Sequence, residues 1–416
     1  MSRYMLLCLS LLLPWSEVAL AEPDVKFSGF GNIGVIHNDS RVLGFHRDYT
    51  MEASGHGWSA NVDSMMGLQL NARFNNHFDA MVQVLLMDRV SDDLEDALEW
   101  AFIRYQPNEQ WSFRAGRLGL DLYMLSEYKD VSYAYLWARP VPEFYSVISS
   151  TTRYNGLDIT YSRHLNDYMF EARLAYGNNN SDLAGADQTV NIELDAIGAL
   201  TLSLSSHDWL WRLAFARSDI SGNNPEADAL LSMIESVPAT LWPAGRSIAA
   251  DIRYKNRISE YYAAGARYDS GHWLIQSELG YTDTNWQPLQ PYISGYISIG
   301  RRVEDFTFYG VYAGVRHTEN TPEVEPPLIQ PFLPPEQQMQ LSALHQAAEH
   351  AYQSSRQQQH TFSAGVRWDF AEDFALKLQW DYVNIGDQGS ALWVREAPES
   401  QDQRVQLFSI NLSFVF

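Results

Sequence analysis

The residues in this chain that could do chemistry are charged side chains, gathered in one segment rich in aromatic residues. The segment spans 119–152 and contains five tyrosines and a tryptophan among charges of both signs. Its charged candidates are Asp121, Glu127, Lys129, Asp130, Arg139 and Glu143. A cluster of this kind does not suggest a nucleophile and its base. Charges of both signs could instead attract or repel ions in an aqueous passage.

A second set of candidates is basic and lies in segments where polar and apolar residues alternate. These residues are Arg73, Arg114, Arg117, Arg173, Arg212, Arg267 and Arg367. Arg114 and Arg117 flank Gly116 just before 119–152, so they are the strongest candidates to face that segment. The alternative is that such charges only hydrate a solvated face or pair with one another, which is the commoner role of any single charged residue.

Motifs for other kinds of chemistry are absent or out of context. Gly29 to Gly34 match the pattern G-x-G-x-x-G, but a dinucleotide site needs a following helix, and here a polar loop follows. His345, Glu349 and His350 lie close together, but not in the register of a zinc-protease motif. There is no G-x-S-x-G and no H-E-x-x-H. The sequence therefore indicates no catalytic residue, no cofactor and no metal.

Seven short polar turns, each followed at once by an aromatic residue, indicate the elements that position these charges. That aromatic residue opens a stretch of alternating hydrophobicity, which is typical of β-strands. The turns with their aromatic residues are Asn75 to Phe78, Asn108 to Trp111, Leu165 to Tyr168, Ser206 to Trp209, Ser270 to Trp273, Val303 to Phe306 and Ala371 to Phe374. Tight turns with an aromatic ring above them are what one rim of a transmembrane β-barrel requires.

Strands placed around these turns, with one more at each end, number sixteen. The predicted strands are 25–37, 65–75, 77–88, 97–106, 109–118, 153–163, 167–177, 190–205, 208–217, 258–269, 271–283, 291–302, 305–318, 359–370, 372–386 and 404–416. An even number closes an antiparallel barrel with both ends on one side. The connections at the other rim are long, and the longest are 38–64, 119–152, 218–257 and 319–358. The predicted fold is all-β, an antiparallel transmembrane barrel with short periplasmic turns and long extracellular loops.

The first 21 residues are predicted to be a secretory signal. Arg3 supplies a positive start, Met5 to Pro14 are mostly apolar, and Ala19-Leu20-Ala21 form a cleavage site, so residues 22–416 would make up the barrel. Cys8, the only cysteine, lies in that signal. The chain has 51 acidic and 29 basic residues, a net charge of −22, which disfavours nucleic acid as a partner.

Alternation within the strands supports a membrane barrel over a soluble sandwich. In 372–382, one face carries Phe374, Trp380 and Tyr382, while the other carries Lys377 and Asp381 in mid-strand. A sandwich core would not tolerate such charges unpaired, whereas an aqueous lumen would. Aromatic pairs eight residues apart are predicted to form the two aromatic girdles at the membrane boundaries. These pairs are Tyr168 with Tyr176, Trp273 with Tyr281, and Phe374 with Tyr382.

The last strand alternates apolar residues up to the terminal Phe416, an ending that resembles the C-terminal signature of Gram-negative outer-membrane barrels. With the signal and the sixteen strands, the whole mature chain resembles the outer-membrane porins. The resemblance implies a passive diffusion channel for small hydrophilic solutes, and assembly as a homotrimer. It also implies that the insertion machinery reads Phe416. In porins the loop after the fifth strand folds into the lumen, so 119–152 is predicted to form the pore constriction.

The sequence leaves both the selectivity and other classes of function open. Phosphate-selective porins line the pore with a basic ladder, whereas 119–152 has a single lysine and several carboxylates. Cation preference, or passage of a neutral solute such as a sugar, fits this composition better. Two alternatives remain: a barrel enzyme, with serine and histidine brought together from distant strands as in outer-membrane phospholipase, and a surface adhesin or receptor.

Overall fold

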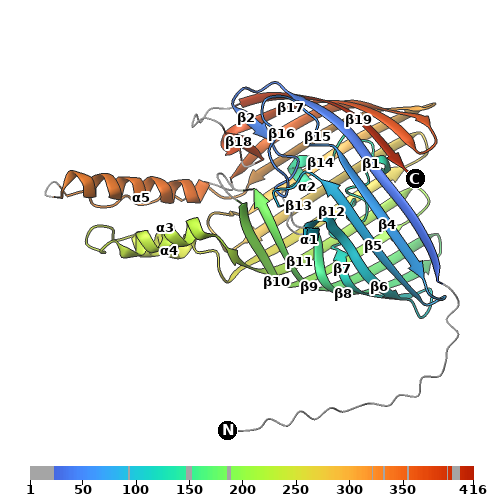
Figure 1. Ribbon diagram of the computed structural model, residues 1–416, viewed down its shortest axis with the longest axis horizontal. Coiled ribbons are helices and arrows are strands. Elements are labelled where there is room, and N and C mark those ends of the chain that lie inside the picture. Colours follow the sequence, from blue (N-terminus) through green and yellow to red (C-terminus); the bar gives the residue numbers. More distant parts are fainter. Residues whose placement is uncertain are drawn as a thin grey trace, which may run out of the picture.

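Sixteen long strands form a single antiparallel sheet that closes on itself (Figure 1). The computed structural model describes residues 23–91, 94–146, 152–184, 189–320, 322–330, 333–353, 356–390, 392–395 and 403–416. The barrel strands are β1 (Asp24–Asn38), β4 (Met65–Arg73), β5 (Phe78–Met87), β6 (Leu98–Tyr105), β7 (Trp111–Gly119), β8 (Arg153–Leu165), β9 (Tyr168–Ala184), β10 (Thr189–Ser205), β11 (Trp209–Asn223), β12 (Arg257–Asp269), β13 (Trp273–Thr284), β14 (Tyr292–Val303), β15 (Phe306–His317), β16 (Gln357–Ala371), β17 (Phe374–Ser390) and β19 (Gln403–Val415). The predicted fold class and all sixteen predicted strands are confirmed. The predicted signal, 1–21, lies outside the described residues.

The first and last strands close the barrel by pairing with each other. β1 pairs with β19 from Phe30 opposite Val415 to Asn38 opposite Leu407. On its other edge, β1 pairs with β4. Closure leaves no strand edge with unpaired backbone groups, which is the condition for a sheet to lie in a membrane.

The seven polar turns lie where the sequence predicts them, and the strand after each one begins at the predicted aromatic residue. Side chains of the turns stabilise them: the Asn75 Oδ1 accepts hydrogen bonds from the backbone N–H groups of His77 and Phe78, at 2.8 and 3.0 Å. At Gly271 the backbone has a φ of +79°, a conformation that glycine adopts without strain.

The outer surface of the barrel carries the apolar and aromatic residues. The seven aromatic residues that follow the turns are all exposed, by 39–42 %. The second aromatic residue of each predicted pair lies on the same outer face, as Tyr176 does with 59 % exposure. Since buried aromatic residues would be expected of a soluble core, this arrangement fits a lipid boundary with aromatic girdles.

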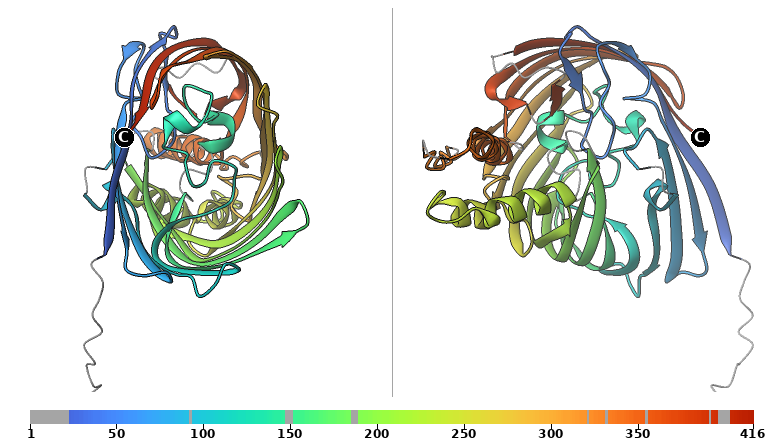
Figure 2. Two further views of the ribbon diagram at one scale, coloured as in Figure 1. Left: turned by 90° about the vertical axis from the view of Figure 1, so that its right-hand side faces the viewer. Right: turned by 60° about the vertical axis from the view of Figure 1, so that its left-hand side comes forward.

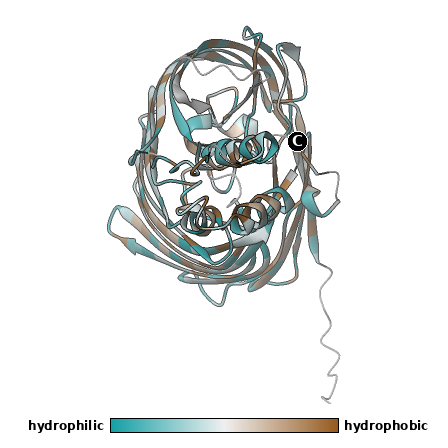
Figure 3. Cartoon of the chain, turned by 90° about the vertical axis from the view of Figure 1, so that its left-hand side faces the viewer, coloured by the Kyte–Doolittle hydropathy of each residue, from teal (hydrophilic) through white to brown (hydrophobic). Residues whose placement is uncertain are grey.

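Helical segments extend beyond the barrel at the rim with long loops (Figures 1 and 3). They are α3 (Pro225–Ser236), α4 (Gly245–Ile252) and α5 (Pro335–Gln353), which pack on a small core of their own around Trp242 and Ala249. Apolar residues recur at helical spacing in α3, as Leu230, Met233 and Ile234, and in α5, as Leu341, Leu344 and Ala348. A four-residue helix, α1 (Leu94–Ala97), precedes β6. No helix in the described part of the chain is long and apolar enough to cross a membrane.

Two long connections fold back over the barrel mouth. β2 (Leu43–Phe45) and β18 (Trp393–Arg395) form a separate two-stranded sheet, and β3 (Gly57–Ser59) pairs with the end of β1. Phe45 and Trp393 pack there with the inner residues Ile36 and Val383. The interior is therefore partly filled near the outer mouth.

Candidate functional site: a segment folded inside the barrel

Residues 120–146, the described part of the predicted constriction segment, lie inside the barrel (Figure 2). The segment contains two short helical turns, η1 (Ser132–Ala134) and α2 (Pro142–Tyr145). It leaves the wall after β7 and contacts strands on the other side of the barrel. The Trp137 Nε1 donates a hydrogen bond to Ser298 of β14 at 2.8 Å, and the backbone N–H of Ala138 donates one to Gln379 of β17 at 2.9 Å.

Arg139 fixes the tip of this segment by charge. Its guanidinium binds both carboxylate oxygens of Asp63, at 3.0 and 2.8 Å, and one oxygen of Asp381 at 3.0 Å. It also donates a hydrogen bond to Ser409. Arg139 is only 1 % exposed, and the two carboxylates hold its pKa above the usual range against the effect of burial. The network joins the inner segment to the loop before β4 and to β17 and β19.

Gly34 on β1 makes room for this network. A Cβ atom at this position would collide with the Cβ of Asp63 and with the side chain of Asn411. Gly34 belongs to the glycine pattern that the sequence excludes as a dinucleotide site. At least one of its glycines therefore has a packing role.

Lys377 on β17 holds the same segment by hydrogen bonds to backbone carbonyls. It is completely buried, and its Nζ donates to the carbonyl oxygen of Trp137 at 2.8 Å and to that of Ser132. The ammonium also lies 4.5 Å from the centre of the Tyr135 ring, which is a cation–π contact. Lys377 therefore acts as a structural anchor of the segment.

The beginning of the segment is held by wall arginines. Asp121 is paired with Arg212 at 2.7 Å and with Arg173 at 3.1 Å. Arg173 also pairs with Glu127 at 3.1 Å, and the Glu127 side chain remains 56 % exposed. Of the six predicted constriction charges, Glu127 is thus the one that most clearly faces solvent.

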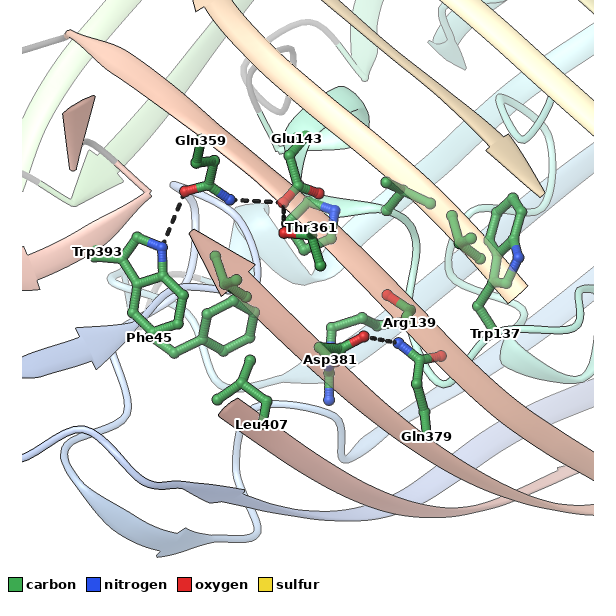
Figure 4. A pocket seen from close by; sticks show the side chains of 15 residues that line it. Phe45, Trp137, Arg139, Glu143, Gln359, Thr361, Gln379, Asp381, Trp393 and Leu407 are labelled. Atoms are coloured by element: carbon green, nitrogen blue, oxygen red, sulfur yellow. Dashed lines mark hydrogen bonds and ion pairs between the residues drawn. The ribbon is translucent and has the colours of Figure 1, made fainter. Parts of the chain in front are cut away.

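Glu143 is buried beside a small cavity (Figure 4). Its Oε1 accepts hydrogen bonds from Gln359, at 2.7 Å, and from Thr361, whereas its Oε2 has no hydrogen-bond partner among the described residues. Burial raises the pKa of the Glu143 carboxyl. The folded state therefore favours the protonated form of this residue.

Replacing Glu143 by glutamine should increase stability at neutral pH and have less effect in acid. A glutamate with a raised pKa binds more protons in the folded than in the unfolded state, so stability falls as pH rises from the ordinary to the raised pKa. Glu143→Gln keeps the acceptor for Gln359 and Thr361 but removes this pH-dependent loss. The midpoint temperature of thermal unfolding is measured in detergent from pH 4 to pH 8. As the pH rises, this midpoint should fall less for the variant than for the wild type. Parallel pH profiles for the two proteins would contradict the prediction.

The remaining two candidates of the segment, Lys129 and Asp130, belong to a dense charged cluster near the outer mouth. The Lys129 Nζ lies 3.9 Å from the Asp48 Oδ2 and 3.8 Å from the Asp130 Oδ1. Glu99 in the same region is 3.1 Å from Arg153. Burial, together with the nearby Glu99, raises the pKa of Asp130. These groups mostly pair with one another, which is the structural role that the sequence leaves open as the alternative.

The basic candidates that the sequence places in alternating segments, the predicted arginines of the pore wall, occupy different environments. Arg114 is paired with Asp158 at 2.7 Å on the inner face. Arg367 donates to the backbone carbonyls of Tyr133 and Tyr135, at 2.6 and 3.0 Å, so it too holds the inner segment. The other inner-face arginines differ in exposure: Arg267 is partly buried, and Arg73 is exposed near the short-turn rim.

Arg117 does not belong to this inner wall. It lies opposite Asn155 and pairs with Glu95 at 2.7 Å. Asn155 alternates with Leu157, an outward residue that is 50 % exposed. Arg114 and Arg117 are three residues apart, so a pleated strand directs them to opposite faces. The prediction that both face the constriction is therefore wrong for Arg117.

Part of the lumen is apolar. Leu120, Leu122 and Phe144 of the inner segment pack against inner wall residues such as Leu194 and Val311 in one buried apolar cluster. This core attaches the segment to the wall over much of its length. Among the described residues, no cluster of histidine, cysteine, aspartate or glutamate could hold a metal ion.

Comparison with known proteins rests on structure. No protein-family model matches the chain, and no curated protein matches it in sequence. The anion-selective porin from Comamonas acidovorans is similar over 95 % of this chain and 100 % of its own, with a TM-score of 0.55 and 12 % identity. OmpF of Salmonella typhi, in complex with daunomycin, is similar over 94 % of this chain and 97 % of its own, with a TM-score of 0.54 and 10 % identity. The chain has the porin fold.

A third porin-fold neighbour is the outer-membrane channel DcaP of Acinetobacter baumannii, at a TM-score of 0.53 and 10 % identity, covering 94 % of this chain and 98 % of that one. Together with the apolar outer band, this likeness gives the chain the fold of the outer-membrane barrels of Gram-negative bacteria, as its sequence predicts. At identities of 10–12 %, the similarity to these proteins shows a shared fold and nothing more. The secretory signal and homotrimeric assembly stay predictions.

Several residues that hold the inner segment are not marked by the sequence. Asp63 lies in an irregular loop, and no pattern around it indicates an ion pair with Arg139. Ser298 and Gln379 are ordinary polar residues on inner faces. Lys377 and Asp381 do carry a signal, because each places a charge in mid-strand on the face opposite the aromatic residues.

Proposed function

We propose that this protein is a passive diffusion channel of the outer membrane for small hydrophilic solutes, with residues 120–146 as its constriction. The observation that carries the proposal is that this segment lies across the lumen while charged side chains of the segment and of the inner wall stay accessible to solvent. Glu127 is 56 % exposed, and the side chain of Arg104, on the inner face of β6, is 42 % exposed. Accessible charges on an inner face are what an aqueous pathway requires.

The accessible charges support a channel of weak ionic preference. Arg104 pairs with Asp79 at 2.9 Å, and Arg173 pairs with both Glu127 and Glu171. Because Arg104 and Arg173 each have acidic partners, both signs of charge are present along β5 to β9. A single-signed ladder, as a dedicated phosphate channel would need, is not formed by these pairs.

Conductance in a planar bilayer tests this function. Purified protein should insert in steps, each giving an ohmic current, and unequal KCl on the two sides should give a small reversal potential. A large reversal potential would replace weak preference by true ion selectivity. If no current appears and phospholipid in vesicles is hydrolysed, the protein is an enzyme and the channel proposal fails.

A second candidate function, binding of a partner at the cell surface, is favoured by the helices beyond the outer mouth. α3, α4 and α5 project from the barrel as a packed unit with its own apolar core (Figure 1). A channel needs no such extension to conduct ions. Removing it would separate the two functions, since conductance should persist while any surface binding is lost.

A further inference from the structure

A cavity of about 90 Å³ lies inside the barrel, between the beginning of the inner segment and the inner faces of β10 to β14. Leu120 and Leu122 form one side of it, and Ile192, Leu194 and Ile220 line the other. Ile192 and Ile220 lie close to the long-loop ends of β10 and β11. The cavity is therefore near the outer mouth, where a solute arriving from outside would enter.

The lining of this cavity is unusual for the inner face of an aqueous barrel. None of the described residues that line it is charged, and most are aliphatic or aromatic. Trp286 and Leu289, from the connection between β13 and β14, complete the wall and are only partly buried. Inner faces that contact water are normally polar. An apolar inner surface beside open space has the composition of a binding pocket.

Packing of the inner segment does not by itself account for the cavity. Protein interiors are close-packed, and voids larger than a water molecule are few. The side chains that line the cavity are themselves buried, as Leu120 and Ile197 are with 1 % and 2 % exposure. The space beside Ile197 and Ala216 is thus left open within an otherwise filled core.

A polar group without a partner belongs to a residue that lines this cavity. Tyr261 of β12 lines it and is 93 % buried, since its exposure is 7 %, and its hydroxyl has no hydrogen-bond partner among the described residues. Gly280 makes room for the hydroxyl, because a Cβ atom there would lie 3.1 Å from the hydroxyl oxygen. Buried hydroxyl groups nearly always have a hydrogen-bond partner. A ligand in the cavity could supply one.

We propose that this outer pocket binds an uncharged organic solute with a small aromatic or alkyl body and one polar group that hydrogen-bonds to Tyr261. Phenol is the simplest solute of this class. The inference goes beyond the proposed function, because it adds a less polar class of solute, held at the outer mouth, to the hydrophilic solutes of the channel. The apolar wall would hold the body of the solute, and the Tyr261 hydroxyl would hold its polar group.

Binding of phenol and toluene to the full-length protein tests the proposal. Saturation-transfer NMR in deuterated detergent should show both solutes bound to the wild type and no binding of glycerol. Tyr261→Phe removes the hydroxyl but keeps the ring, so it should weaken phenol about two- to tenfold and leave toluene unchanged. Ala216→Leu fills the pocket and should weaken both solutes about tenfold or more. Ala214→Leu, one pleat away on the same inner face but outside the pocket, is the matched control.

The outcomes separate this proposal from the channel function. Equal binding of both solutes to wild type, Tyr261→Phe and Ala216→Leu would mean partition into detergent and would overturn the pocket. If Ala216→Leu fails to fold, the test rests on Tyr261→Phe, which must weaken the binding of phenol and leave the binding of toluene unchanged. If the protein conducts but the variants bind phenol and toluene as the wild type does, the pocket alone is overturned. If the variants change binding as expected but the protein does not conduct, the channel is overturned and the pocket stands.

Discussion

Replacing Arg139 by alanine should loosen the tip of the inner segment and raise the single-channel conductance. Arg139 is the buried cation between Asp63 and Asp381, so its loss leaves two buried carboxylates without their counter-charge. Removing one partner of a buried ion pair typically costs about 3–5 kcal/mol, because the remaining charge is poorly solvated. The segment would also lose its bonds to Asp381 of β17 and Ser409 of β19. A wider and less stable channel should result.

Single-channel recordings and thermal unfolding in detergent measure the two parts of this prediction. Arg104→Ala is the matched control, since Arg104 also pairs with an aspartate on an inner wall but both side chains are partly exposed. An exposed pair is worth about 0–1 kcal/mol, so the control should keep its stability. Unchanged conductance in Arg139→Ala, with lowered stability, would show that the segment is not a constriction.

Deleting Phe416 should sharply reduce the amount of assembled barrel in the outer membrane. The resemblance to outer-membrane barrels implies that the insertion machinery reads this terminal residue. Phe416 also closes the barrel, because its backbone N–H and carbonyl exchange hydrogen bonds of 2.9 Å with Gly29. Its ring lies over Gly29, where a Cβ atom would collide with it. Loss of Phe416 would remove both the signal and the last contacts of the closing seam.

The assembled fraction is measured as the heat-modifiable form of the protein in outer-membrane fractions. Phe408→Ala provides the control, since Phe408 is on the same strand and the same outer face, with 46 % exposure against 54 % for Phe416. If loss of an outer aromatic ring were the whole effect, the two changes would act alike. Assembly of the Phe416 deletion at wild-type level would refute a role of the C-terminal residue as a signal.

The fold could be predicted from the sequence because each strand carries its own local signal. A turn at Asn75 or Ser270 and the aromatic residue after it mark a boundary by themselves, through side-chain hydrogen bonds and lipid contact. Alternation then fixes which face of each strand meets lipid. Strand ends at the outer rim are less well marked. β9 and β11 continue beyond the predicted ends at 177 and 217, because polar residues there also suit strands that leave the membrane.

The candidate site was predictable only in part. The segment 119–152 follows from counting strands, and the sequence shows all six of its charged residues, but not what they contact. Arg117 lies three residues from Arg114, so strict alternation places the two arginines on opposite faces of β7. The ion pair between Arg139 and Asp63 joins residues 76 positions apart, and neither residue has a local pattern that indicates the other.

The sequence by itself determined that this chain is a sixteen-stranded membrane barrel, because turns, alternation and aromatic boundaries are local features that every strand repeats. Only the tertiary structure decided which charges face solvent. Asp121, Arg139 and Glu143 are buried against the wall, and Glu127 remains exposed. It also decided that part of the lumen is apolar around Tyr261. Both follow from the way one irregular segment packs across the barrel, and packing between distant residues leaves no periodic signal in the chain.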